Sequence, residues 1–219
     1  MKALLYKEFK LAMHPTCYVF IFLFPLMALI PSYPLGIGFI YVLSCYPILF
    51  LGANKGQQSN DLLFSTLLPV RKKDIVLARI ITVAVMQFVF IAMMAALYPV
   101  ASYIHTHISE AKGITLKGFM TLVSFAIIGY AIADLIFFPI YYRRGKSIVG
   151  STLATLFGFI AYIGITTIAL PYIITSAFTF LYDHIWVQAI ILVASLAVYF
   201  LIHIAVYKIS SKKLERVDF

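Results

Sequence analysis

Few residues in this chain have types and spacing that could do chemistry. Gly145, Lys146 and Ser147 stand in the order that closes a phosphate-binding loop. That loop needs a further glycine five residues before Gly145, so that its backbone N–H groups can cradle phosphates, but Ile140 stands there. The flanking residues are also typical of membrane helices rather than of a strand. We therefore interpret the triplet as a basic loop, and ATP that drives this protein must bind to another chain.

Histidine is the next residue type with catalytic or metal chemistry. His105 and His107 are close in sequence, but no clear cluster of further ligands accompanies them. His203 falls in the last apolar run, where we expect it to pack. The GxSxG and HExxH patterns of hydrolases and metalloproteases are missing. We expect no catalytic residue and no metal site.

Asp134 is the one acidic residue inside the apolar runs. A carboxylate at the bilayer centre costs about 2.5–3.5 kcal/mol on insertion scales. On a straight helix Asp134 lies roughly 13 Å from Arg143, which places it part-way into the membrane. It either lines a substrate path, forms an ion pair between helices, or bonds nearby backbone or hydroxyl groups at a helix crossing. We take it as a candidate residue of a translocation path.

The elements that position these residues are membrane helices. The chain is 63% hydrophobic and 11% charged, and its mean hydropathy is +1.00, values typical of an integral membrane protein. A spanning helix needs roughly 20 apolar residues. We predict an all-α fold with six transmembrane helices: Thr16–Tyr33, Gly36–Ala53, Ile75–Ser102, Phe119–Tyr142, Ile148–Ser176 and Ile185–Tyr207.

The chain is predicted to form one transmembrane domain over residues 1–219. Residues 1–15 form an amphipathic helix, residues 16–207 hold the six spans, and residues 208–219 form a tail. Prolines are expected to break the first span, at Pro25, Pro31 and Pro34, and the fifth span, at Pro171.

The net charge of +9 follows the membrane topology rather than a nucleic-acid surface. In the six-span arrangement, Lys112 and Lys117 are the only lysines or arginines on one side, and the remaining basic residues lie on the other. Positively charged loops stay in the cytoplasm. Both termini are therefore predicted to be cytoplasmic.

An amphipathic segment joins the second and third spans. Asn60 is a plausible N-cap and Pro69 ends the turn. Read as a helix, the segment has a polar start at Asp61 and one apolar face, formed by Leu63, Phe64, Leu67 and Leu68. A basic cluster follows, made of Arg71, Lys72 and Lys73. We predict a cytoplasmic interfacial helix that another protein can hold.

The N-terminal segment is also amphipathic. Lys7, Lys10 and His14 share one face of a helix, and an apolar face lies opposite, formed by Leu5, Phe9, Ala12 and Met13. Such a helix lies in the plane of the lipid headgroups. It acts either as an anchor or as a lever that also contacts a cytoplasmic partner.

Two sequence motifs carry a family resemblance. Residues 67–79, LLPVRKKDIVLAR, resemble the LPVSRKEIVLAKY signature of small bacterial permeases of ABC type-2 exporters, although Arg71 replaces a common serine. Residues 138–145, FPIYYRRG, are similar to the PLYYKFG pattern that closes the fourth span of those permeases. The chain most resembles permeases that export phenol-soluble modulins, which are amphipathic, cytolytic peptides.

The resemblance implies a complex of two permeases, identical or paralogous, and two ATPase subunits in the bacterial cytoplasmic membrane. The segment Asp61–Leu68 would be the coupling helix, seated in a groove of the ATPase, with the basic cluster beside it. ATP and Mg²⁺ would bind to the ATPase, and this chain would hold no cofactor. Amphipathic peptides would leave the cell between the two permeases.

Other functions stay open on the sequence alone. An ABC permease for lipids, drugs or bacteriocins, or for immunity, would look much the same. A secondary transporter usually has two related halves and more charge within the membrane. A scaffold that transports nothing is a further alternative. Co-purification with an ATPase would separate these classes.

Overall fold

The computed structural model describes residues 2–12, 15–27, 70–107, 119–144, 148–176 and 184–216. Within these ranges the chain is helical and contains no strand. The elements are α1 (Lys2–Lys7), the π-helix η1 (Glu8–Ala12), α2 (Pro15–Met27), α5 (Lys72–His107), α6 (Phe119–Arg144), α7 (Ile148–Ser176) and α9 (Ile185–Glu215). The predicted all-α membrane fold is confirmed.

The described part of the chain contains four helices long and apolar enough to span a membrane. These spans are Lys72–Ala101, Phe119–Arg143, Val149–Thr166 and Ile185–Glu215, and they match the last four predicted spans. Of the first predicted span, the structure describes only the 13-residue helix α2. The second predicted span, Gly36–Ala53, lies outside the described residues, as do Pro31 and Pro34.

Prolines do not break the described helices, contrary to expectation. The helix α2 runs through Pro25 to Met27, and the backbone of α7 is helical through Pro171 to Ser176. Pro99 and Pro139 likewise lie inside α5 and α6. A proline removes one backbone hydrogen bond, but neighbouring groups and small local adjustments can compensate for it in a membrane helix.

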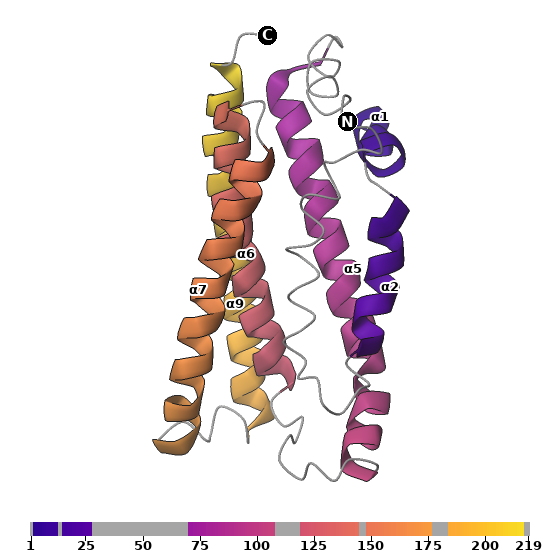
Figure 1. The fold of residues 1–219 in the computed structure, drawn as a ribbon, viewed down its shortest axis with the longest axis vertical. Coiled ribbons are helices and arrows are strands. Elements are labelled where there is room, and N and C mark those ends of the chain that lie inside the picture. Colours follow the sequence, from indigo (N-terminus) through magenta and orange to yellow (C-terminus); the bar gives the residue numbers. More distant parts are fainter. Residues whose placement is uncertain are drawn as a thin grey trace.

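The helices form two groups, which Figure 1 shows side by side. On one side α6 packs closely against both α7 and α9, and on the other α2 and the N-terminal segment pack against α5. The helices α5 and α9 are in contact with each other and join the groups. Any relative motion of the two groups must therefore alter the contacts that α5 makes.

One end of the molecule is basic. The N-terminal segment, the start of α5, the end of α6, the start of α7 and the end of α9 all lie at this end (Figure 1). Lys73 forms an ion pair with Glu215 at 3.2 Å, and the Lys213 Nζ donates to the Pro139 carbonyl at 3.1 Å. The predicted clustering of basic residues thus holds for these helix ends, while the side of the membrane on which they lie stays a prediction.

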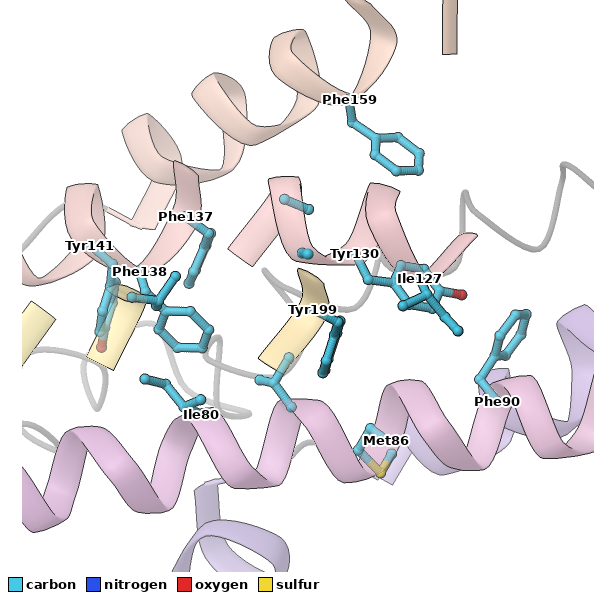
Figure 2. Packing of buried hydrophobic residues seen from close by; sticks show 14 of the residues in the cluster. Ile80, Met86, Phe90, Ile127, Tyr130, Phe137, Phe138, Tyr141, Phe159 and Tyr199 are labelled. Carbon is cyan, nitrogen blue, oxygen red and sulfur yellow. The ribbon is translucent and has the colours of Figure 1, made fainter. Parts of the chain in front are cut away.

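An aromatic core fills the space between the helices. Figure 2 shows Ile80 and Phe90 of α5 pointing toward the side chains of α6 and toward Tyr199 of α9. Within α6 the rings of Phe137 and Tyr141 stack with centroids 5.7 Å apart. Bulky rings supply much of the buried apolar area, because an aromatic side chain buries about 150–250 Å².

A glycine of α7 lies at the contact with α6. A Cβ atom added at Gly158 would lie 2.3 Å from the Ile136 Cδ1. Small residues allow helix backbones to approach closely in membranes. The end of the Ile136 side chain therefore occupies the space that a side chain at Gly158 would need.

Candidate functional site

The described helices hold two buried polar clusters, both organised around α5. Arg79 belongs to the first and Gln87 to the second, and eight residues of α5 separate them by about 12 Å along the axis. Both side chains are almost fully buried, with Arg79 2% exposed and Gln87 3% exposed. A buried polar group must find a partner, because leaving it unpaired costs several kcal/mol in hydrocarbon.

The first cluster joins the N-terminal segment to α5 and α6. The Arg79 Nε donates to Glu8 Oε2 at 2.9 Å, and the Arg79 Nη2 donates to Glu8 Oε1 at 3.2 Å. The Arg79 Nη1 also donates to the Tyr141 hydroxyl at 3.1 Å. Lys7 adds a longer ion pair to Glu8, at 3.7 Å. A bidentate pair of this kind fixes orientation as well as distance.

The second cluster joins α5, α6 and α9 inside the membrane. Asp134 on α6 is 0% exposed. Its Oδ2 accepts from the Gln87 Nε2 and contacts the His203 Nε2, each at 3.0 Å. The Tyr199 hydroxyl donates to the Gln87 Oε1 at 2.6 Å. Of the three alternatives for Asp134, the structure shows a polar pair between helices.

The hydrogen-bond geometry of the second cluster shows where His203 and Asp134 need hydrogens. The His203 Nδ1 lies 2.9 Å from the Tyr199 carbonyl. A carbonyl only accepts, so Nδ1 carries a hydrogen. The contact between His203 Nε2 and Asp134 Oδ2 needs one more proton, held by either atom. In both cases the pair has no net charge, which lowers the cost of burying it.

The predicted interfacial residues divide between two environments. Phe9 is partly buried against the core and Leu5 is half-buried, whereas Lys10 is exposed and Lys7 is half-buried. The Lys7 side chain is 11% exposed, so the predicted division into a polar and an apolar face holds for Lys10 and Phe9 but not for Lys7. His14 lies outside the described residues. Leu4 and Glu8, which were not predicted as interfacial residues, are 5% and 3% exposed.

The predicted coupling segment is described only at its basic end. Asp61, Leu63, Phe64, Leu67 and Leu68 lie outside the described residues, so their role stays a prediction. Arg71 is exposed and pairs with Asp74 at 3.3 Å, just before and within the first turn of α5. Lys72 begins α5, and Lys73 reaches Glu215 at the end of α9.

Two features of the sequence indicate that Arg79 needs a partner and that Glu8 is a candidate for it. Arg79 stands inside the predicted third span, where an unpaired guanidinium would be costly, so a partner was required. Glu8 is the one acidic residue in the N-terminal segment. His203 was expected only to pack, yet it contacts the one carboxylate inside the predicted spans.

Comparison with known protein families gives one match. The family described as ABC-2 family transporter protein matches residues 3–215. This range includes both buried clusters, from Glu8 to His203. No curated protein matches the chain. No solved structure matches it either.

Proposed function

Because the chain belongs to the ABC-2 transporter family, we propose that it is a permease subunit that exports amphipathic, cytolytic peptides from a bacterial cell. Members of this family are the membrane subunits of ABC transporters and work with a separate ABC ATPase. The peptide substrate and the outward direction are the parts that we propose.

The proposed complex has two permeases and two ATPase subunits. Residues 1–219 form one transmembrane domain, and both termini face the cytoplasm of the bacterial membrane. The second permease is another copy of this chain or a paralogue. ATP and Mg²⁺ bind to the ATPase subunits, and this chain holds no cofactor. The segment Asp61–Leu68 sits on the ATPase as the coupling helix.

The position of α5 is the observation that supports this mechanism best. It begins at Lys72, four positions after Leu68, the last residue of the predicted coupling segment. Arg79 then joins it to Glu8 of the N-terminal segment, and Gln87 joins it to Asp134 of α6 and Tyr199 of α9. A displacement of the coupling segment thus reaches both helix groups through one rigid helix.

Asp134 is the candidate that connects this motion to the substrate. In the present structure α5 and α9 cover it completely. When α5 moves away from α6, Gln87 leaves the carboxylate, and Asp134 can then face a path between the permeases. A carboxylate beside aromatic rings suits a peptide with one apolar and one lysine-bearing face.

The experiment is ATP hydrolysis by the complex reconstituted in vesicles. Lysine-bearing and neutral amphipathic peptides of equal length and apolar content are added in turn. We expect both to stimulate hydrolysis, and we expect Asp134→Asn to weaken stimulation by the lysine-bearing peptide more.

Two results would count against this function. Equal loss for both peptides would make Asp134 a structural residue only. Stimulation by a lipid, drug or bacteriocin, with none by the amphipathic peptides, would show an ABC permease for that other substrate.

A further inference from the structure

An apolar groove of about 250 Å³ runs between α5 and α9. Its α5 wall extends from Leu77 to Ala84, and its α9 wall extends from Tyr199 to Tyr207. Its exposed lining is almost entirely apolar. Both walls belong to helices that span the membrane. The groove is larger than the ~150 Å³ apolar cavity that is known to hold a benzene molecule.

Aromatic rings lie beyond one end of the groove. Phe88, one turn beyond Ala84, packs edge-on against Tyr199 at 5.3 Å and stacks against Phe200 at 6.5 Å. These rings lie beyond the end of the groove that Ala84 and Tyr199 form. The other end, at Leu77 and Tyr207, points toward the basic end of the molecule. The walls run for about 10–12 Å between these ends.

A basic residue lies beyond the end of the groove that Leu77 and Tyr207 form. Lys208 is exposed and follows Ile204 by one turn, so it lies on the helix face that lines the groove. Lys73 precedes Leu77 by one turn on α5, although Glu215 pairs with it at 3.2 Å. The apolar groove therefore leads toward a positive charge near the basic end of the molecule.

We propose that this groove binds one acyl chain of an anionic phospholipid, whose headgroup lies at Lys208. An apolar tail and a negative head match the two parts of the site. A lysine-rich amphipathic peptide matches it less well, because its charges would meet Lys208. An anionic headgroup gains about 1 kcal/mol from each nearby lysine or arginine.

The groove also borders the second buried cluster. Tyr199 and His203 line it. The Tyr199 hydroxyl also donates to Gln87, and the His203 Nε2 contacts Asp134. A chain that fills the groove keeps water and competing groups away from the Asp134–His203 pair. The lipid would thereby hold α5 against α9 in the arrangement seen in this structure.

Lipid retention by the full chain tests this proposal. The purified chain is titrated with phosphatidylglycerol and with phosphatidylcholine of the same acyl chains, and bound lipid is counted by native mass spectrometry. We expect phosphatidylglycerol to bind about fivefold more tightly at one site. Lys208→Gln should remove this preference, whereas Lys2→Gln, which removes an exposed charge in α1, should keep it.

A second pair of variants tests the groove itself. Ala84→Trp places an indole between the walls and should abolish binding at this site. Ala197→Trp adds the same ring on an exposed position of α9 that does not line the groove, and should leave binding unchanged. If Ala84→Trp fails to fold, Ala84→Leu fills less space and should weaken binding.

Three results would overturn the proposal. The first is equal binding of the two lipids to the wild-type chain. The second is unchanged binding to a folded Ala84 variant. The third is binding of a lysine-rich amphipathic peptide, and not of phosphatidylglycerol, to the wild-type chain, with that peptide binding lost in Ala84→Trp, since the occupant would then be a peptide.

Discussion

Glu8 and Arg79 form a bidentate ion pair, with hydrogen bonds of 2.9 and 3.2 Å, although 71 positions separate them in the chain. Both side chains are 3% exposed. The pair fixes the N-terminal segment to α5 about 10 Å along the axis from the first residue of that helix. The segment is therefore held by a directional contact as well as by its apolar face.

Breaking this pair should destabilise the protein strongly. We expect Glu8→Gln to cost about 3–5 kcal/mol, because it leaves the Arg79 charge buried with a weaker acceptor. Lys73→Ala, which removes the exposed pair with Glu215, should cost about 0–1 kcal/mol. Denaturant unfolding of the purified chain in detergent measures both. Equal effects would mean that burial does not govern the strength of the Glu8 contact.

The second cluster should respond to removal of both ionisable groups more mildly than to removal of one. His203→Ala leaves Asp134 without the partner that shares its proton, so we expect a loss of several kcal/mol. Asp134→Asn combined with His203→Gln keeps neutral polar groups of similar size and should be less destabilising. Thermal unfolding of the single and double variants gives the comparison. A double variant less stable than His203→Ala would contradict the shared-proton interpretation.

The close approach of α6 and α7 predicts a specific compensation. Gly158→Ala should lower the melting temperature relative to Gly164→Ala, because the new methyl group requires the Ile136 Cδ1 to move. Shortening the neighbour, in Gly158→Ala with Ile136→Val, should recover part of that loss. Gly164→Ala serves as the control, since a Cβ atom there meets nothing within 4 Å. Similar melting temperatures for the two single glycine variants would refute the assignment.

The coupling segment predicts a selective loss of partner binding. Replacing both Phe64 and Leu67 with Asp should detach the ATPase while the permease still inserts. Each apolar anchor in an interface typically contributes about 2 kcal/mol or more when it is a hot spot. Co-purification measures the loss. An ATPase that stays bound would show that this face lies on lipid instead.

Topology provides a further prediction. Cysteines introduced at Gln58 and Arg144 should be shielded from an impermeant thiol reagent outside the cell. A cysteine at Lys112 should react. If the cysteine at position 58 reacts from outside, the orientation that the basic residues indicate is wrong.

Much of the helical framework could be predicted from residue type alone. Long apolar runs gave the positions of α5, α6, α7 and α9, because a helix is the simplest way to satisfy backbone groups in lipid. The actual helices are longer at the ends: α5 begins at Lys72 rather than Ile75, and α9 ends at Glu215 rather than Tyr207. Polar residues can continue a helix beyond the hydrocarbon.

The pairing of polar residues could not be predicted in the same way. The sequence shows that Arg79 and Asp134 need partners, but it does not show which helices meet. Glu8 and His203 become partners only because η1 lies on α5 and α9 lies on α6. Such contacts depend on packing between segments that are distant in the sequence. The hydrophobic periodicity of one helix does not predict which other helix packs against it.

The order of synthesis gives the Asp134–His203 pair a further consequence. Gln87 is synthesised before Asp134. The Gln87 amide of α5 can therefore donate to Asp134 as soon as α6 enters the bilayer. His203 follows 69 residues later. A nascent chain that stops before α9 therefore holds a carboxyl group without its histidine. Insertion of α9 completes the pair. A truncated chain that lacks α9 therefore differs from the full chain in having an Asp134 carboxyl group without its contact to His203.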